Sequence, residues 1–260
     1  MSGLKSSRSE GAARRFLLRI AGIALFLAAW QAATSFELLG PVFGPAFGPG
    51  AGGRALLAMA RSGVLFEQTE ASLGRFGLGL LLAVVIGGPL GFIVGYFRSL
   101  EELTTVVFQI LRMTSPLALV PIALIAFGVG SRPVVFLIAY AAVWPVVLST
   151  AHGVSRVSPA WKRMVRGFGA RDGSVLRKVI VPAALPELVQ GIRLAVGVGW
   201  IVLVPAEMLG VDSGLGYQIL DSRDRFAYDE LVATILVIGL LGLALDLVLR
   251  RLKELVSWTA

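Results

Sequence analysis

Three ionisable side chains lie inside long apolar segments of this sequence, where a charge is costly. They are Arg112, Glu207 and Asp246. A charge near the middle of a membrane-inserted helix costs about 2.5–3.5 kcal/mol, so each one needs a partner or a function. Such groups line ion or solute pathways, or they snorkel or pair with a neighbour inside a helix bundle, and pairing is the simpler interpretation of Glu207 and Asp246. Arg112 is the better pathway candidate because a proline break follows it at Pro116, and its guanidinium would suit an anion.

The sequence supplies little for other site chemistry. It contains no cysteine, which excludes disulfides, thiolate zinc sites and cysteine-ligated iron-sulfur clusters. The single histidine, His152, falls at the end of an apolar segment and fits an interfacial residue better than a proton relay, so no metal site is expected. No GxxxxGK[ST] phosphate loop occurs, so we expect the chain neither to bind nor to hydrolyse ATP.

The composition is that of an integral membrane protein. Of 260 residues, 56% are hydrophobic and 15% are charged, against about 45–50% and about 25% in soluble domains. A spanning helix needs about 20 mostly apolar residues, and six windows qualify. These windows are 17–35, 73–96, 103–127, 133–152, 188–210 and 231–249. We therefore expect an all-α membrane protein with about six transmembrane helices.

The positions of the cationic residues indicate which loops are cytoplasmic. They gather before the first window, after the second, between the fourth and fifth, and after the sixth, while the 212–230 loop holds five acids. By the positive-inside bias, both termini are cytoplasmic and the protein is a multi-pass protein of the cell membrane. The net charge of +8 therefore does not indicate nucleic-acid binding, because the cations flank apolar spans. We interpret 17–35 as a retained anchor and not a cleaved signal peptide.

The loop after the first window is rich in glycine and proline. Residues 40–53 read GPVFGPAFGPGAGG, which predicts an irregular, non-cytoplasmic segment. Residues 54–62 have the spacing of a short helix with one apolar side, and we expect it on the membrane surface. No internal repeat is evident, which weakens the case for an inverted-repeat transporter.

The second window carries small residues at four-residue spacing, at Gly87, Gly91 and Gly95. Such a spacing lets another helix approach closely, either within one subunit or in a dimer. In the third window, Pro116 and Pro121 predict a kink that turns polar groups toward the bundle interior.

The pathway candidates are polar or aromatic residues of the third, fourth and fifth windows. They are Arg112, Thr114, Ser115, Trp144, Ser149, Trp200 and Glu207. For the two tryptophans, ordinary helix packing or an interfacial position is the simpler alternative.

Residues 161–186, here called the docking loop, form a basic segment between two apolar windows. The loop carries six cations. Its pattern predicts a helix over 161–168, a left-handed turn at Gly169 and a second helix over 172–180, which Pro182 should end. Pro186 suits the first turn of the fifth span. Met164 and Val165 would then form an apolar tip framed by cations. On spacing alone, a surface for a partner and an ordinary solvated basic loop are equal alternatives.

The docking loop resembles the EAA loop of binding-protein-dependent ABC importer permeases. Gly169 is followed by nine residues and then by Val179, Ile180, Val181 and Pro182, and the ALP ending at Pro186 is usual in the nitrate, sulfonate and taurine group. The EAA itself is replaced by Arg163, Met164 and Val165. Further matches extend the resemblance over about residues 70–250; they are Ser72, Leu73, Arg75, Gly79, Gly87, Gly91, Gly95, Pro116, Pro121, the FGVG at 127–130, Ala206, Glu207 and 214–217.

The resemblance implies a type I importer fold and a set of partners. Two permease copies, most simply a homodimer, would enclose the pathway. A periplasmic or extracellular solute-binding protein would deliver the solute to the 40–53 and 212–229 loops, and a cytoplasmic ABC ATPase subunit would hold ATP and Mg and bind the docking loop. The residues implied for ATPase coupling are Arg163, Met164, Val165, Gly169, Ala170, Val179, Pro182 and Pro186. The solute would be a small anion such as nitrate, a sulfonate or taurine, with neutral heterocycles and vitamin precursors as the alternative that relatives of this group suggest. Specificity would rest with the binding protein.

The expected organisation has four parts. Residues 1–16 form a cytoplasmic tail, 17–69 the first span and its loop, 70–250 the type-1 transmembrane domain, and 251–260 a second cytoplasmic tail. The principal alternative is an ion-coupled secondary transporter or channel, in which Arg112, Glu207 and Asp246 carry the coupling charge and no ATPase is needed. A membrane-embedded enzyme ranks last, because no Ser/Lys, Asp/Asp or His-metal constellation is visible at membrane depth.

Overall fold

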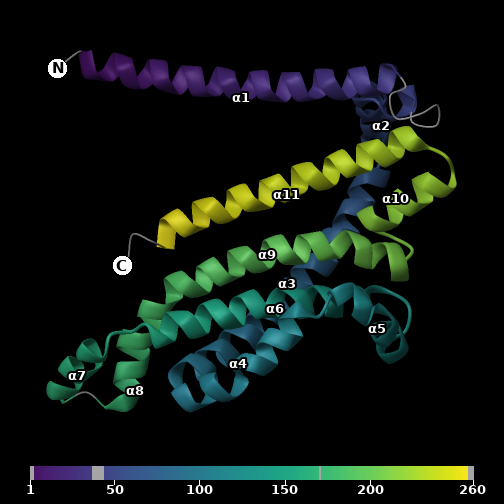
Figure 1. The fold of residues 1–260 in the computed structure, drawn as a ribbon. Helices are drawn as coiled ribbons and strands as arrows, with labels where there is room; N and C mark the ends of the chain where they lie inside the picture. Colours follow the sequence, from purple (N-terminus) through teal and green to yellow (C-terminus); the bar gives the residue numbers. More distant parts are fainter. Residues whose placement is uncertain (1–2, 37–43, 170, 257–260) are drawn as a thin grey trace. The chain divides into compact units, whose positions relative to one another are not determined.

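The computed structural model is helical throughout the residues it describes, which are 3–36, 44–169 and 171–256 (Figure 1). The helices are α1 (Gly3–Ser35), η2 (Pro45–Phe47), α2 (Pro49–Ser62), α3 (Val64–Tyr96), α4 (Arg98–Met113), η3 (Pro116–Leu119), α5 (Val120–Phe127), α6 (Ser131–Ser155), α7 (Pro159–Gly167), α8 (Asp172–Val175), η4 (Leu176–Ile180), α9 (Val181–Gly210), α10 (Leu215–Asp224) and α11 (Tyr228–Val256). The expected all-α class is confirmed.

Among the described residues, four helical segments are long and apolar enough to cross a membrane. They are Val64–Tyr96, Ser131–Ser155, Asp172–Gly210 and Tyr228–Arg251. The bent pair α4 and α5 would make a fifth span, and the apolar part of α1, Ile20–Ser35, is shorter. The count of six spans therefore stays a prediction.

The chain divides into two compact units. The smaller comprises Met1–Leu65 and Asp221–Leu236, and the larger comprises Phe66–Leu220 and Val237–Ala260. In the smaller unit, Phe47 stacks on Tyr228 with ring centroids 4.8 Å apart. There Gly52 of α2 lies so close to α11 that an added Cβ would be 2.6 Å from Val232 Cγ1.

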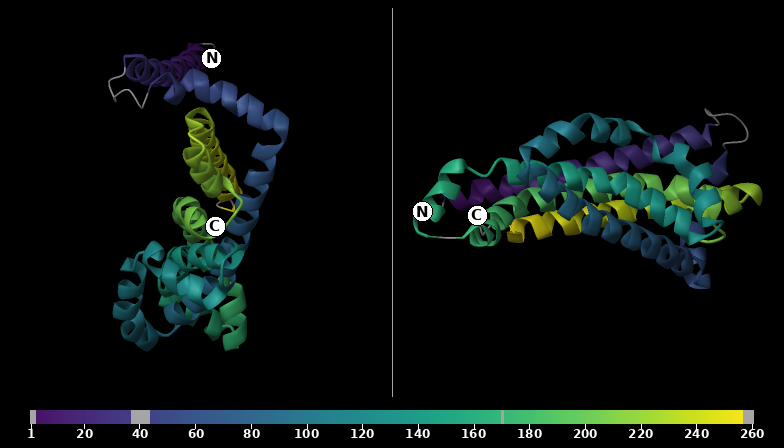
Figure 2. Two further views of the ribbon diagram at one scale, coloured as in Figure 1. Left: turned by 90° about the vertical axis from the view of Figure 1, so that its right-hand side faces the viewer. Right: turned by 90° about the horizontal axis from the view of Figure 1, so that it is seen from below.

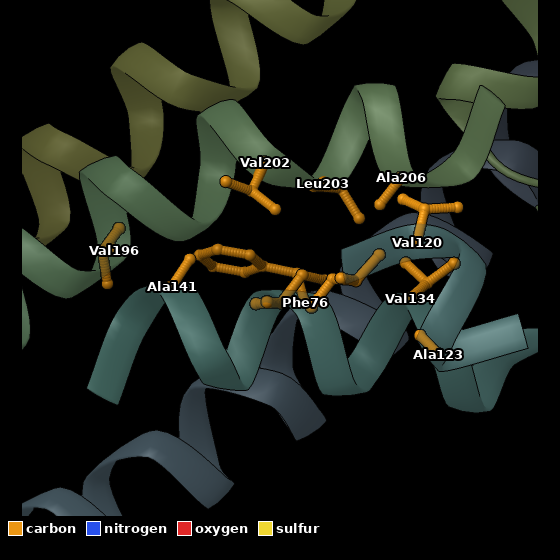
Figure 3. Packing of buried hydrophobic residues seen from close by; sticks show 11 residues of the cluster. Phe76, Val120, Ala123, Val134, Ala141, Val196, Val202, Leu203 and Ala206 are labelled. Atoms are coloured by element: carbon orange, nitrogen blue, oxygen red, sulfur yellow. The ribbon is translucent and has the colours of Figure 1, made fainter. Parts of the chain in front are cut away.

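The larger unit is built around α6 and α9, which lie side by side along their lengths (Figures 1 and 2). Its main cluster of buried side chains joins Phe76 of α3, Val134 and Ala141 of α6, and Leu203 of α9 (Figure 3). Since lipid is as apolar as these side chains, close packing and not water exclusion holds the helices together within a membrane.

Glycines set the distance between α3 and α6. An added Cβ would lie 3.0 Å from Val143 O at Gly87, 2.9 Å from Val147 Cα at Gly91, and 2.7 Å from Ala151 Cα at Gly95. All three glycines are buried. The regularly spaced glycines of α3 thus lie against the backbone of α6 in the same chain, which leaves no room there for another helix.

The predicted kink in the third window is a complete break. Helix α4 ends at Met113, Thr114 and Ser115 are extended, and the axes on the two sides differ by 83°. A proline disfavours the helical conformation of the residue before it, so Pro116 accounts for the extended backbone of Ser115. Pro121 suits the first turn of α5. The hydroxyl of Tyr140 donates to Leu111 O at 2.7 Å, and the same carbonyl oxygen also accepts from the Thr114 N–H at 3.2 Å, so two donors hold the end of α4.

Local predictions are wrong at residues 49–53 and at Pro182. Helix α2 already begins at Pro49, so the 49–53 part of the glycine-rich segment is helical, since proline is favourable at the first helical position; residues 40–43 lie outside the described part. Pro182 does not end the second helix of the docking loop, because α8, η4 and α9 are continuous. Their junction is a π-helical turn in which the Val181 N–H bonds Leu176 O, five residues back, and this wider turn accommodates the proline.

The glycine contacts generate a stability prediction. Gly91→Ala should lower the unfolding free energy by about 1–3 kcal/mol, because the methyl group would overlap the α6 backbone. Gly77→Ala on the same helix is the control, since an added Cβ there has nothing within 4 Å. Thermal unfolding in detergent measures both variants, and equal melting temperatures would contradict the close approach.

Candidate functional site

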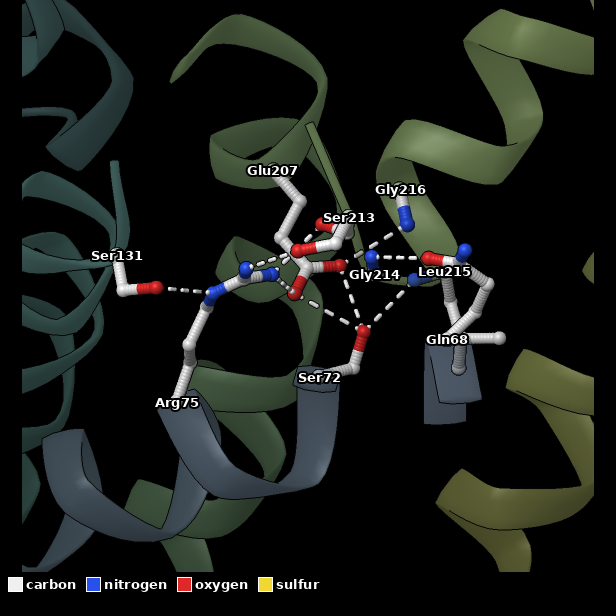
Figure 4. Close-up of polar contacts among 9 residues, drawn as sticks. All are labelled: Gln68, Ser72, Arg75, Ser131, Glu207, Ser213, Gly214, Leu215 and Gly216. Atoms are coloured by element: carbon white, nitrogen blue, oxygen red, sulfur yellow. Dashed lines mark hydrogen bonds and ion pairs between the residues drawn. The ribbon is translucent and has the colours of Figure 1, made fainter. Parts of the chain in front are cut away.

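The buried carboxylate of Glu207, in the last turn of α9, is the centre of a polar network (Figure 4). Glu207 is 0% exposed. Its Oε1 accepts a hydrogen bond from Arg75 Nη1 at 2.8 Å, and its Oε2 accepts from Ser72 Oγ at 2.7 Å and from the Gly216 N–H at 3.0 Å. Both oxygens are therefore occupied within the chain, and α3, α9 and α10 meet at one charge.

Arg75, which is only 7% exposed, extends the network to two further elements. Its Nε donates to Ser131 Oγ, at the start of α6, at 2.9 Å. Its two terminal nitrogens donate to Ser213, Nη1 to the main-chain oxygen at 2.7 Å and Nη2 to Oγ at 2.6 Å. The planar guanidinium thus binds a carboxylate, a loop and a helix start at once, which a lysine ammonium would not reproduce.

The turn into α10 is shaped around this carboxylate. Gly214 has φ +106, and an added Cβ there would lie 2.6 Å from Glu207 Cδ, so only glycine fits. The Gly214 N–H donates to Gln68 Oε1, and the Leu215 N–H donates to Ser72 Oγ at 2.8 Å. The N–H groups at the start of α10 are therefore directed at α3 side chains and at an anionic group, which the positive end of the helix dipole favours.

The sequence indicated Glu207 but not its partners. Ser72 and Arg75 are one turn apart on α3, so they lie on the same face of that helix. This spacing of two hydrogen-bond donors was the only sequence signal that could have indicated partners for the buried acid. No such signal existed for Ser131, Ser213 and Gln68, because only the folded chain brings them close to Arg75 and to the turn before α10.

A recess in the larger unit brings together several of the predicted pathway residues. It has a volume of about 480 Å³. Its polar lining comprises Arg112, Thr114, Tyr140, Trp144 and Ser149. We call it the Arg112 recess.

The remaining pathway candidates lie elsewhere. Ser115, Trp200 and Glu207 do not line the Arg112 recess. Trp200 packs edge-on against Phe76, with ring centroids 5.4 Å apart. Asp246 accepts hydrogen bonds from Arg193 at 3.0 Å and from Arg250 at 2.7 Å. Two of the three intramembrane charges, Glu207 and Asp246, are therefore paired with arginines of the same chain.

The docking loop has the predicted helix, turn and helix. Helix α7 ends at Gly167, and Gly169 adopts φ +79 in the left-handed region. Met164 is 59% exposed and Phe168 is 87% exposed. Ala170 lies outside the described residues.

The inner side of the docking loop is anchored in the bundle. A small core of Val154, Val175, Ile180 and Ala184 receives Val165 and Val179 from the loop. The prediction that Val165 shares the apolar tip with Met164 is wrong, because Val165 packs inward against this core. Phe168 joins Met164 on the outside, together with exposed Arg163 and Pro182. Pro186 is half-buried inside α9 and not in its first turn, as predicted, because the helix already begins at Val181.

Comparison with known proteins identifies related chains. The family model for the binding-protein-dependent transport system inner membrane component matches residues 87–257. The chain is 36% identical to the bicarbonate transport system permease protein CmpB of Synechococcus elongatus, over 94% of this chain and 90% of the relative. It is 33% identical to the taurine transport system permease protein TauC of Escherichia coli, again over 94% of this chain and 90% of the relative.

Solved structures agree in fold. Inward-facing MetNI, a methionine ABC transporter, matches with a TM-score of 0.62 and 16% identity, over 76% of this chain and 98% of that one. An amino acid ABC transporter determined with histidines matches with a TM-score of 0.56 and 19% identity, over 79% and 98%. The predicted importer permease fold is thereby confirmed.

The Glu207 network generates a second stability prediction. Arg75→Met should cost about 3–5 kcal/mol, because it leaves the Glu207 carboxylate buried and unpaired. The double variant Arg75→Met/Glu207→Gln should recover part of that loss. As a control, Arg98→Gln breaks only the exposed pair with Glu102 and should change the unfolding free energy little. Urea unfolding in detergent would refute the network if Arg75→Met and Arg98→Gln behave alike.

Proposed function

This chain belongs to the family of binding-protein-dependent transport system inner membrane components, and we propose that two copies of it form the membrane pathway for a small anion. It is a permease subunit of an ABC importer, a transport component and not a catalyst. In the proposed complex, ATP and Mg are held by a separate ATPase subunit. A solute-binding protein delivers the anion from the other side of the membrane.

The exposed tip of the docking loop carries this proposal. Met164 and Phe168 present apolar surface outside the spanning segments, and Arg163 adds a cation beside them. Exposed apolar side chains with a charged border are the usual composition of a protein contact. Behind the tip, Val165 and Val175 pack into the bundle. A displacement of the tip should therefore also displace the start of α9. We assign this tip to a groove of the ATPase subunit in the cytoplasm.

The opposite loop is the proposed contact for the binding protein. Arg225 Nη2 bonds Glu230 Oε2 and Asp221 Oδ2, both at 2.7 Å. The hydrogen bonds that Arg225 donates to Glu230 and then to Asp221 raise the pKa of Arg225 above its ordinary value, so the guanidinium stays charged. Ordered charges at a rim favour fast, specific association with a charged partner.

The proposed substrate class rests on the relatives and on one cation. CmpB and TauC are named for bicarbonate and taurine, both of which carry an oxyanion group. Arg112 supplies a positive charge at the Arg112 recess, whereas Glu207 and Asp246 are held in ion pairs. That pairing disfavours the ion-coupled alternative, which needs those acids free to bind and release a cation.

The tip is tested by charge insertion. Met164→Asp combined with Phe168→Asp should reduce recovery of the ATPase subunit with the tagged chain at least tenfold, because a buried unpaired carboxylate would oppose the contact. Val129→Asp, at an equally exposed valine of the loop before α6, is the control and should retain the ATPase. Quantitative mass spectrometry of the purified complex gives the ratio. Full recovery from the double variant would count against the tip.

The turn is tested separately from the tip. Gly169→Val should uncouple ATP hydrolysis from uptake while membrane insertion stays intact, since a β-branched residue is strained at φ +79 by roughly 1–2 kcal/mol. Gly173→Val is the control, because Gly173 has no positive φ and nothing lies within 4 Å of an added Cβ. Uptake and hydrolysis measured together in proteoliposomes decide the point, and normal coupling in Gly169→Val would be the contrary result.

A further inference from the structure

An apolar groove lies between α3 and α6 in the larger unit, and we call it the α3–α6 groove. Its volume of about 530 Å³ lies within the range of small-molecule sites, about 300–1,000 Å³. Its sides carry aliphatic residues of both helices, which are Leu78, Leu82, Ile86, Val135, Ala139 and Val143. No acidic residue occurs among the described residues that line it. An apolar surface is expected of any helix in lipid, but a concave one of this size can hold a single molecule.

Aromatic rings form one wall of the α3–α6 groove. Phe127, at the end of α5, and Phe136 of α6 have ring centroids 5.3 Å apart, and Phe136 lies 6.3 Å from Tyr140. The Tyr140 hydroxyl is committed to Leu111 O. This wall is therefore apolar, and its one polar side-chain atom is already paired.

Arg132 places a cation at one end of the groove. It is the second residue of α6, and its side chain is exposed. In the part of the chain that the structure describes, its guanidinium makes no ion pair and no hydrogen bond. A charge at the end of a spanning segment lies at the depth of lipid headgroups, whereas the rest of the groove lies at the depth of hydrocarbon. The groove therefore has the charge distribution of a site for an amphipathic anion.

The length of the groove favours a lipid over a helix of a second copy. From Arg132 to Val143 it follows α6 for about 17 Å, at 1.5 Å per residue. Beyond Val143 the groove closes, because Val146 and Val147 are buried against the glycines of α3. The hydrocarbon of one leaflet is about 15 Å deep, half that of a bilayer. An acyl chain fits this length, whereas a spanning helix needs a matching face about twice as long.

We propose that the α3–α6 groove binds an anionic phospholipid from the leaflet opposite the docking loop. One acyl chain lies along Leu82 and Ala139, and the headgroup phosphate accepts hydrogen bonds from Arg132. Every lipid present can offer an acyl chain, so selectivity comes from the cation. One cation near a membrane surface favours an anionic lipid about fivefold. This site lies apart from the Arg112 recess and does not depend on the proposed function.

Photoactivated labelling of the full chain in phosphatidylcholine nanodiscs tests the site. The probes are phosphatidylglycerol and phosphatidylcholine, each with the same diazirine on one acyl chain, and peptide mass spectrometry locates the adducts. We expect saturable labelling of the groove residues, with phosphatidylglycerol favoured about fivefold. Arg132→Gln should bring this ratio close to one. Arg156→Gln, at an exposed cation at the other end of α6, is the control and should leave the ratio unchanged.

A second variant fills the groove and leaves the cation in place. Ala139→Trp should reduce groove labelling by both probes at least tenfold, because the indole would occupy the volume of the acyl chain. Ile93→Trp, at an exposed position of α3 outside the groove, is the control and should label normally. If Ala139→Trp does not fold, the labelling ratio of Arg132→Gln, a surface change, decides the point.

Each contrary outcome is distinct. Equal labelling of the groove by the two probes, or an unchanged ratio in Arg132→Gln, would refute recognition by Arg132. Labelling that is as strong at exposed Leu240 of α11 as in the groove would reduce the groove to ordinary lipid-facing surface. A groove without adducts overturns the proposal, and if that chain purifies as a dimer the groove belongs to a second copy. None of these results bears on the proposed function.

Discussion

The larger unit depends on one buried charge, the carboxylate of Glu207. A carboxylate at 0% exposure is tolerable only if its oxygens are paired, and Arg75, Ser72 and the Gly216 N–H supply those partners. The partners come from α3 and from the start of α10. The end of α9 is therefore held against these two helices. The same helix begins at the docking loop and continues for 30 residues, about 45 Å at 1.5 Å per residue. Helix α9 therefore acts as a strut between the proposed ATPase contact and a fixed point at the opposite end.

The two sides of α6 differ in how closely they are packed. On one side, the glycines of α3 lie directly against the α6 backbone, so no side chain separates the two helices there. On the other side, α4 and α5 are joined by two extended residues and an 83° bend, and no residue of α4 is buried. The Arg112 recess lies on this looser side. A displacement of α9 relative to α4 would therefore change the recess while leaving the packed pair intact.

Much of this arrangement was predictable from local sequence. Pro116 and Pro121 predicted the break, Gly169 predicted the turn of the docking loop, and the resemblance to importer permeases gave the fold. The errors share a cause, which is that residues unfavourable in helices were expected to prevent them. Pro182 was expected to end a helix, but a π-helical turn accommodates it. The glycines of 49–53 were expected to exclude a helix, but α2 begins there. The partners of Glu207 were not predictable, because Arg75 is 132 residues distant and only the fold brings the two together. The buried Nε1 of Trp144, which has no hydrogen-bond partner within the described part of the chain, likewise could not be predicted from a single sequence.

In the proposed complex, the docking loops of the two copies each bind an ATPase subunit, so closure of the ATPase pair around ATP should bring the two loops together. The chain contains no cysteine, so Phe168→Cys, at a side chain 87% exposed, provides one spin-label site per copy. Double electron–electron resonance on the complex with its ATPase and binding protein would measure the distance between the two labels. The account predicts one dominant distance that shortens when ATP and vanadate trap the closed ATPase. An absence of any dipolar signal between copies, or a distance that nucleotide leaves unchanged, would contradict it.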